Sequence, residues 1–548
     1  MKFDDGKIKD ILQGENYVSA EDLEKGAASA RAHRVSLVDA LLAENLITKD
    51  LLGQAIAESF DVAFLDLSAN PPPRDLVTRL PAAMAKQERV VLVAEEHHQV
   101  KVATDDPGRS TLKTKLKKLW PRKKLVVVYA LPEDIDGILK HYRPPLGKRF
   151  LAILQQRQRV APELIDEIIE DAVTSRASDI HIEPQGQEIV VRFRVDGVLY
   201  EAGRIPKRYY EMLLNRIKIE ARLRIDEHFA AQDGAIRHEQ RDRVIDMRVS
   251  IVPTYDGEKV AIRLLTDYVR EFTLGRLGLS ERHQQQLLEA ARQPFGMILV
   301  TGPTGSGKTT SLYALMKVLN APEINITTIE DPIEYQVTGI NQIQANPNTN
   351  LTFAQGLRSI IRQDPDVVLV GEIRDQETAE IAINAALTGH LLLSTFHAND
   401  AATVIPRLIE MGVEPFLVAS TLELVIAQRL VRTICRVCRV SQPVNLEAVA
   451  ELYPQIRRYL RGAKTTLYHG KGCAACNGTG YQGRTGLFEV IAMTPAMEEL
   501  ILRRPTTQMV WQRAVQQGSR SLFEDGIDKV KAGKTTLEEL LRVAPPPS

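Results

Sequence analysis

The residues best suited to chemistry lie between Phe295 and Tyr313, FGMILVTGPTGSGKTTSLY. The apolar run Met297–Val300 predicts a buried parallel strand, and a helix is expected to begin at Lys308 or Thr309. The turn between them fits G-x-x-x-x-G-K-[ST], a pattern in which backbone N–H groups and a helix N-terminus surround a phosphate. We therefore predict a nucleoside triphosphatase with Lys308 on the β/γ-phosphates and Thr309 on Mg²⁺. The expected nucleotide-binding residues are Gly302, Pro303, Thr304, Gly305, Ser306, Gly307, Lys308, Thr309 and Thr310.

Phosphoryl transfer to water also needs carboxylates that hold Mg²⁺ and orient the attacking water. Glu330, with Asp331 and Glu334 close behind it, follows the strand-like run Ile326–Ile329. Glu372 follows a second such run. Because parallel strands present their carboxyl ends at one edge of a sheet, both acids are expected near the phosphate turn. We assign Glu372 to the Mg²⁺ shell and Glu330 to water orientation, and the reverse assignment stays open.

Three basic side chains are weaker candidates. His397 follows the run Leu391–Thr395 and would either sense the γ-phosphate or bridge to the acidic residues, unless it is structural. Arg358 and Arg362 lie four residues apart on one expected helical face. They would donate to phosphate across a subunit boundary or pair with local acids such as Asp364.

Four cysteines form two C-x-x-C pairs, which is a strong metal-binding pattern. Cys435 and Cys438 form one pair, Cys473 and Cys476 the other, with 34 residues between the pairs. Four thiolates suffice for a closed, structural zinc site, and His469 is a spare ligand. A disulfide pair or free thiols are the alternatives.

Composition bounds the class of protein. The 548 residues suggest several domains, and 26% charged with 44% hydrophobic residues is ordinary for a globular protein. With 70 basic and 70 acidic residues the net charge is zero, which gives no support for nucleic-acid binding. There is no signal peptide or run of about 20 apolar residues, so we expect a cytoplasmic protein.

The chain order predicts an α/β multidomain protein with a RecA-like parallel-sheet core. An N-terminal α+β domain is expected over 1–142, a linker over 143–160 and a second α+β domain over 161–265. The core follows from 266 to 548, with the zinc motif at 435–476 and C-terminal helices at 494–548. Within these, we expect a helix capped by Thr48, a strand at Val62–Leu67, a hairpin turn at Asp196-Gly197 and a capping box of Thr535 with Glu538.

A basic stretch is not explained by this organisation. Seven lysines and arginines crowd the residues between Lys113 and Lys124. They form a solvated helix face, or they contact anionic lipid head groups or an acidic partner.

Together these motifs resemble the ATPases of type II secretion and type IV pilus assembly over nearly the whole chain. The matching segments are ASDIHIEP, VRFRVDGVL, GPTGSGKTTSLYA, ITTIEDPIEY, LRSIIRQDPDVVLVGEIRD, LLLSTFHANDA, the tetracysteine segment and TTLEELLRV. The resemblance implies a homohexameric ATP-driven motor at the inner face of the bacterial inner membrane, with a platform protein and a membrane-associated docking protein as partners. It also implies that Arg194, and Arg358 with Arg362, approach the nucleotide.

Within this family, Ser36–Leu67 is more similar to pilus extension ATPases than to type II secretion ATPases. The remaining alternatives are a type II secretion ATPase or a DNA-uptake motor. Two departures from the family pattern stand out. Ala231–Ala235 reads AQDGA where relatives carry a basic residue at the end, and Arg34-Val35-Ser36 lacks the glycine of a cyclic di-GMP motif, so we expect no cyclic di-GMP.

Overall fold

The computed structural model describes most of the chain. The described residues are 5–14, 17–33, 36–43, 46–67, 71–139, 142, 149–150, 153, 160–240, 243–265, 273–346, 349, 351–460, 464–473, 476 and 478–546. The chain divides into two compact units: Met1–Pro145 with Cys435–Val440 and Gly470–Gln482, and Leu146–Ile434 with Ser441–His469 and Gly483–Ser548. The expected linker falls largely outside the described residues, as do Arg34 and Val35.

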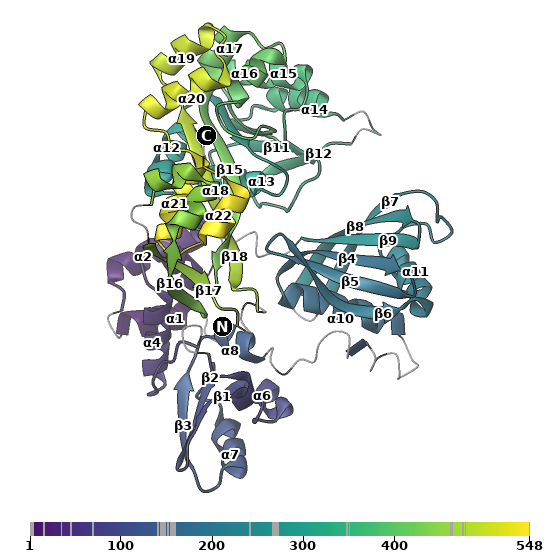
Figure 1. Cartoon of the computed structure of the whole chain (residues 1–548), viewed down its shortest axis with the longest axis vertical. Coiled ribbons are helices and arrows are strands. Elements are labelled where there is room, and N and C mark those ends of the chain that lie inside the picture. The colour runs from purple at the N-terminus through teal and green to yellow at the C-terminus, as the bar shows by residue number, and fades with distance from the viewer. Residues whose placement is uncertain are drawn as a thin grey trace. The chain divides into compact units, whose positions relative to one another are not determined.

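The N-terminal part begins with helices and continues into a small sheet (Figure 1). Its helices are α1 (Asp5–Gly14), α2 (Ala20–His33), α3 (Leu37–Ala43), α4 (Lys49–Ser59), α5 (Arg74–Val77), α6 (Ala82–Glu88), α7 (Ser110–Leu119) and α8 (Pro132–Leu139). The sheet has the order β1 (Val90–Glu95), β2 (Gln99–Thr104), β3 (Lys124–Tyr129). Thr48 caps α4 as expected, because its side chain accepts the Leu51 N–H.

The expected strand at Val62–Leu67 is wrong. Within this segment only Phe64 forms a β-bridge, and its partner is Tyr129. Tyr129 is the last residue of β3, so β3 does not extend far enough to pair with the rest of the segment. The basic stretch lies on α7, on the turn after it and at Lys124, the first residue of β3. Leu112 and Leu116 bury one face of α7, while Lys115 pairs with Glu88 on α6.

A six-stranded antiparallel sheet with its own core follows (Figure 1). Its order is β6 (Val198–Pro206), β5 (Glu188–Val195), β4 (Ala177–Gln185), β9 (Gly257–Leu265), β8 (Arg243–Thr254), β7 (Gln232–Gln240). The helices are α10 (Val160–Thr174) and α11 (Tyr210–Glu220), the latter after a 3₁₀ turn at Lys207–Tyr209. Asp196 (φ 50°) and Gly197 (φ 85°) make the expected hairpin turn between β5 and β6.

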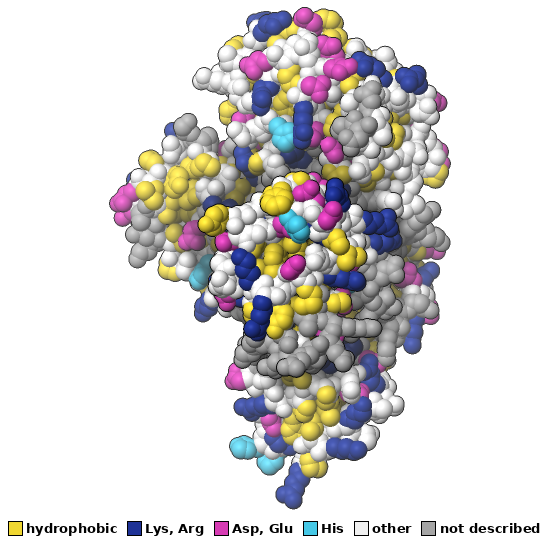
Figure 2. Space-filling model, turned by 90° about the vertical axis from the view of Figure 1, so that its right-hand side faces the viewer, with side chains coloured by type: hydrophobic (Ala, Val, Ile, Leu, Met, Phe, Trp, Pro, Cys, Tyr) yellow, Lys and Arg dark blue, Asp and Glu magenta, His cyan; other side chains and the backbone are white. Residues whose placement is uncertain are grey.

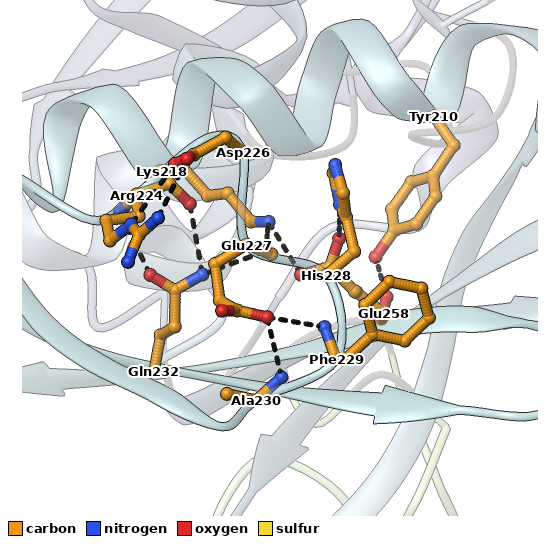
Figure 3. Close-up of polar contacts among 10 residues, drawn as sticks. All are labelled: Tyr210, Lys218, Arg224, Asp226, Glu227, His228, Phe229, Ala230, Gln232 and Glu258. Atoms are coloured by element: carbon orange, nitrogen blue, oxygen red, sulfur yellow. Dashed lines mark hydrogen bonds and ion pairs between the residues drawn. The ribbon is translucent and has the colours of Figure 1, made fainter.

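A buried lysine fixes the loop between α11 and β7 (Figure 3). Lys218, fully buried, lies 2.7 Å from Glu258 and donates to the Glu227 carbonyl at 2.6 Å. Glu258 is also 2.7 Å from His228 Nδ1. Glu227 in turn accepts the N–H groups of Phe229 and Ala230. This polar network holds a loop whose Phe229 ring is 92% exposed.

The C-terminal core is built on a seven-stranded sheet (Figure 1). Its order is β12 (Asn341–Gln344), β11 (Ile326–Glu330), β13 (Val367–Val370), β14 (Leu391–Phe396), β10 (Gly296–Thr301), β15 (Leu422–Ile434), β18 (Tyr481–Ala492). The strands from β12 to β15 pair in parallel. The expected parallel α/β core is confirmed.

Helices bury both faces of this sheet. The alternating residues of β10 show this, since they belong to two different hydrophobic cores. Met297 and Leu299 belong to one core, Ile298 and Val300 to the other. The helices are α12 (Glu281–Ala291), α13 (Lys308–Leu319), α14 (Phe353–Ile360) with a 3₁₀ turn at Ile361–Gln363, α15 (Gln376–Leu387), α16 (Val404–Glu410) and α17 (Pro415–Thr421).

The chain between the cysteine pairs folds into short elements, as its length requires. They are β16 (Arg439–Asn445), α18 (Leu446–Leu452), a 3₁₀ turn at Pro454–Arg458 and β17 (Lys464–Gly470), which pairs with β16. The C-terminal helices are α19 (Pro495–Leu502), α20 (Thr507–Gln516), α21 (Leu522–Lys531) and α22 (Leu537–Val543). None of the described helices is long and apolar enough to cross a membrane.

The expected capping box of Thr535 with Glu538 is wrong, because the cap lies one residue later and the Glu539 carboxylate binds Arg432 and Arg542. Thr536 is the N-cap of α22 and accepts the Glu539 N–H. Thr535 Oγ1 instead donates to the Arg432 carbonyl on β15, and the Glu539 carboxylate pairs with Arg432 at 2.9 Å. These contacts with β15 set the start of the helix.

Candidate functional site

The phosphate turn, which we call the P-loop (Gly302–Thr309), joins β10 to α13 in a conformation that glycines allow. Gly302 has φ 144°, and a Cβ there would lie 2.4 Å from the Gln428 carbonyl oxygen. Gly307 has φ 85° and is the N-cap of α13, so the first N–H groups of that helix face the loop. The strand, loop and helix therefore have the geometry of an anion site, in which backbone N–H groups and a helix N-terminus face one loop.

Lys308 is folded back over its own loop. Its ammonium donates to the carbonyls of Gly302 at 2.9 Å and Pro303 at 3.2 Å. Burial lowers the pKa of Lys308, and the nearby Glu372 carboxylate opposes that shift. Ser306 Oγ and Gln428 Nε2 are buried without a hydrogen-bond partner. A phosphate, which accepts hydrogen bonds, suits these donors and the buried cation.

Glu372, two residues after the end of β13, is held by two basic side chains. His397 Nε2 lies 2.9 Å from one of its carboxylate oxygens, and Arg374 lies 2.7 Å from the other. The carboxylate is 12% exposed, whereas the imidazole is 46% exposed. The structure thus brings Glu372, His397 and Lys308 together at the carboxyl ends of adjacent strands.

A cavity of about 240 Å³ lies beside this group. Its lining comes from the P-loop, from the segment between β14 and α16, and from α16 itself: Gly302, Pro303, His397, Ala398, Asn399, Asp400, Thr403 and Arg407. Arg407 Nη1 donates to the His397 carbonyl at 2.7 Å. Neither Arg374 nor Arg407 was a candidate from the sequence. Arg374 follows Glu372 by two residues, so its position could have suggested it.

Glu330 lies in a different environment. Its side chain is 2% exposed and accepts hydrogen bonds from Thr328 Oγ1 at 2.6 Å, from Gln342 Nε2 at 3.3 Å and from the Tyr313 hydroxyl. Burial raises the pKa of Glu330, which favours its protonated form. These hydrogen bonds connect β11 to α13 and β12, and none of them involves Lys308 or His397.

The three candidate arginines pair locally. Arg194 on β5 donates to the Gly197 carbonyl at 3.0 Å and lies 3.6 Å from Asp179. Arg358 pairs with Glu377 at 2.8 Å, not with Asp364. Arg362, in the 3₁₀ turn after α14, donates to the Arg358 carbonyl at 2.8 Å.

The four cysteines converge, with all four Sγ atoms within 4.8 Å of one another. Cys435–Cys473 and Cys438–Cys476 are separated by 3.8 Å and Cys473–Cys476 by 3.7 Å. A tetrahedron with Zn–S bonds of about 2.3 Å has S···S edges of about 3.8 Å. A disulfide requires about 2.05 Å, so the arrangement fits a tetrathiolate metal site and not a disulfide pair.

Comparison with known proteins shows the family to which the chain belongs. The sequence profile described as "Type II/IV secretion system protein" matches residues 155–542, and the MshEN domain profile matches residues 60–148. The chain belongs to the type II/IV secretion family. It is an ATPase of that family, and the family implies ATP with Mg²⁺ as its substrate.

Individual relatives share different lengths of the chain. The type IV pilus assembly ATPase PilB of Myxococcus xanthus is 36% identical over 558 aligned residues, which cover 98% of each chain. The type II secretion system protein E of Dickeya dadantii is 47% identical over 380 residues, covering 69% of this chain and 75% of its own. The solved Legionella pneumophila ATPase DotB matches 70% of this chain and 95% of its own with TM-score 0.52 at 21% identity, which supports the fold.

The surface agrees with the neutral composition. On the face drawn in Figure 2, Lys and Arg side chains are interspersed with Asp and Glu side chains. They do not gather there into one basic surface of the kind that tracks a nucleic-acid backbone.

Proposed function

We propose that this ATPase drives type IV pilus assembly. The observation that carries the proposal is the match to the pilus assembly ATPase of Myxococcus xanthus, which extends over 98% of both chains. The type II secretion protein of Dickeya dadantii is more identical but aligns to only 69% of this chain. The alignment with the pilus ATPase thus includes a part of this chain, about 29% of its length (98% less 69%), that the alignment with the secretion protein leaves out.

The proposed reaction is hydrolysis of ATP at the P-loop. The P-loop N–H groups and Lys308 bind the phosphates, and Lys308 exchanges its two carbonyl acceptors for phosphate oxygens. Thr309 and Glu372 would hold Mg²⁺, which neutralises the charge developing on the phosphate oxygens. The water oxygen bonds to the γ-phosphorus, the bond to the β–γ bridging oxygen breaks, and the water releases a proton toward a carboxylate.

Glu372 is better placed than Glu330 to orient that water. Its carboxylate is near Lys308 and is held by His397 and Arg374, whereas Glu330 is buried against Tyr313. We therefore propose that Glu372 performs both carboxylate roles and that Glu330 ties β11 to α13. Glu372→Gln should reduce phosphate release by at least about 10²-fold and retain ATP binding, while Glu330→Gln retains at least a tenth of the rate. If Glu330→Gln released phosphate more slowly than Glu372→Gln, the role of orienting the water would belong to Glu330.

Other family features complete the proposal. The tetracysteine cluster holds a structural zinc, and the chain acts as a homohexamer in which Arg194, Arg358 and Arg362 exchange their local partners for nucleotide contacts from a neighbouring subunit. The hexamer sits in the cytoplasm at the inner membrane, on a platform protein and a docking protein.

The choice between pilus assembly and secretion is tested in the source bacterium. Deletion of the gene should abolish surface pili and leave exoprotein secretion intact. The wild-type gene should restore pili, and the Lys308→Ala variant, produced at the same level, should not. Intact pili with lost secretion would replace pilus assembly by type II secretion.

A further inference from the structure

The segment after β14, which we call the His397 loop (His397–Thr403), is attached to its surroundings by backbone hydrogen bonds. Ala398 N donates to Thr301 Oγ1 at 2.8 Å, and Thr301 directly precedes the P-loop. Ala401 N donates to Glu489 Oε1 at 2.8 Å. The loop therefore takes its position from β10 on one side and from a carboxylate of β18 on the other.

The strand that carries Glu489 is attached to the C-terminal helices. The N–H of Phe488, the residue before Glu489 on β18, donates to Asp525 Oδ2 of α21 at 2.9 Å. The backbone of Leu522, the first residue of α21, lies close enough to the Glu489 carboxylate to act on its pKa in the lowering direction. Glu489, 5% exposed, thus binds the loop that carries His397 from a position on β18 beside the start of α21.

A carboxylate is a costly choice for this position. Among the described residues, no Lys, Arg or His forms an ion pair with Glu489. Burial raises its pKa to about 7, and the negative charges of Asp400 on the loop and Glu524 on α21 act in the same direction. A buried, unpaired carboxylate destabilises the fold at neutral pH, whereas the Ala401 N–H is satisfied by an ionised acceptor better than by a protonated one. The hydrogen bond to the His397 loop offsets part of this cost.

We propose that Glu489 is a positioning residue for ATP hydrolysis: it fixes the His397 loop to the part of β18 that also binds α21, so that the placement of His397 beside the P-loop depends on β18 and the C-terminal helices. The inference rests on the proposed role of His397 and Glu372 at the nucleotide. It adds a coupling element to that site, because a shift of α21 would reach the His397 loop through Phe488 and Glu489 on β18.

The test uses the full chain and three variants. Glu489→Leu removes both acceptors, and Glu489→Gln keeps one amide oxygen and cannot ionise. Glu539→Leu removes a different buried carboxylate, from α22, that does not touch the loop. At saturating ATP, Glu489→Leu should lower kcat by about 10²-fold with KM changed less than about threefold, since a 1 Å misplacement of a catalytic group has an effect of that order.

The conservative variant and pH separate positioning from loss of stability. Glu489→Gln should recover at least about tenfold of the lost kcat, and it should lose the decline in wild-type kcat as pH falls from about 8 to 6, where the Glu489 carboxylate protonates. Glu539→Leu should unfold at lower temperature but keep kcat below that temperature. A Glu489→Leu variant with kcat within threefold of wild type, or one that falls no further than Glu539→Leu, would overturn the proposal.

Hydrogen exchange at the Ala401 amide measures the hydrogen bond between the His397 loop and Glu489 directly, and it does not require ATP hydrolysis. Exchange should be faster in Glu489→Leu than in wild type and unchanged in Glu539→Leu. Wild-type exchange in Glu489→Leu would overturn the proposed attachment. If the wild-type protein released no phosphate, the proposed function would fail, and the exchange result would still decide whether Glu489 holds the loop.

Discussion

The buried Lys218–Glu258 pair allows a quantitative prediction about the loop between α11 and β7. Replacing Lys218 by Met leaves the Glu258 carboxylate, 6% exposed, without its closest cation and the Glu227 carbonyl without its donor. At 2.7 Å and an effective dielectric of about 20, the attraction that is lost is about 6 kcal/mol. The Lys218 ammonium no longer has to be desolvated in the variant, so the net cost should be about 3–5 kcal/mol.

A second substitution should recover much of this loss. Lys218→Met with Glu258→Gln removes the uncompensated charge and should recover at least about 2 kcal/mol relative to Lys218→Met alone. Lys207→Met, a lysine of the same domain that lies in a surface 3₁₀ turn, is the matched control and should change stability by less than about 0.5 kcal/mol.

The measurement is hydrogen exchange of the amides in β7, β8 and the α11–β7 loop of the full chain, which reads the stability of this sheet separately from the other domains. Protection of these amides from exchange should be highest in Lys207→Met, lower in the double variant and lowest in Lys218→Met. A double variant as unprotected as Lys218→Met would show that the buried charge is not the cause, and the reasoning would be refuted.

Three further predictions concern the metal, a cap and the P-loop. Metal analysis should find about one zinc per chain, lost in Cys438→Ser; much less than one in the wild type would reject the tetrathiolate site. Burial opposes ionisation of Glu539, but hydrogen bonds from Arg542 and Arg432 lower its pKa from 4.5 to about 2. The stability that this ionised carboxylate contributes above pH 4.5 should therefore decrease by roughly 1–3 kcal/mol as the pH falls toward 2. In thermal unfolding, Glu539→Gln should lose this decrease in stability at acid pH. Gly302→Ala should weaken ATP binding by at least about tenfold, because its Cβ meets the Gln428 carbonyl, whereas Gly305→Ala, with open space around the Cβ, should weaken it less; equal affinities would contradict this.

The sequence predicted the frame of the site because local rules and tertiary structure agree there. The apolar runs before Gly302, Glu372 and His397 are all strands of one parallel sheet, so residue type and position after a strand were sufficient to bring these side chains to one edge. The cysteine spacing predicted a cluster for the same reason: the pairs are local, and the chain between them is long enough to close.

Sequence reasoning could not separate Glu330 from Glu372. Both end buried strands, and only the packing of Tyr313 against one of them distinguishes a buried carboxyl from one at the nucleotide edge. Glu489 gave no signal either, because its hydrogen-bond partner is the backbone N–H of Ala401, in a distant segment. The capping box expected at Thr535 was wrong because Arg432, over a hundred positions earlier, binds Thr535 and Glu539, and the N-cap is Thr536. These outcomes depend on long-range contacts that local patterns do not contain.

Steady-state phosphate release by the full-length protein, with ATP, Mg²⁺ and zinc present, addresses the nucleotide site itself. Wild type should turn over, Lys308→Ala should lose nearly all activity, and Glu372→Gln should bind ATP while releasing phosphate at least about 10²-fold more slowly. A wild-type rate no faster than that of both variants would contradict the assignment of this site to ATP hydrolysis.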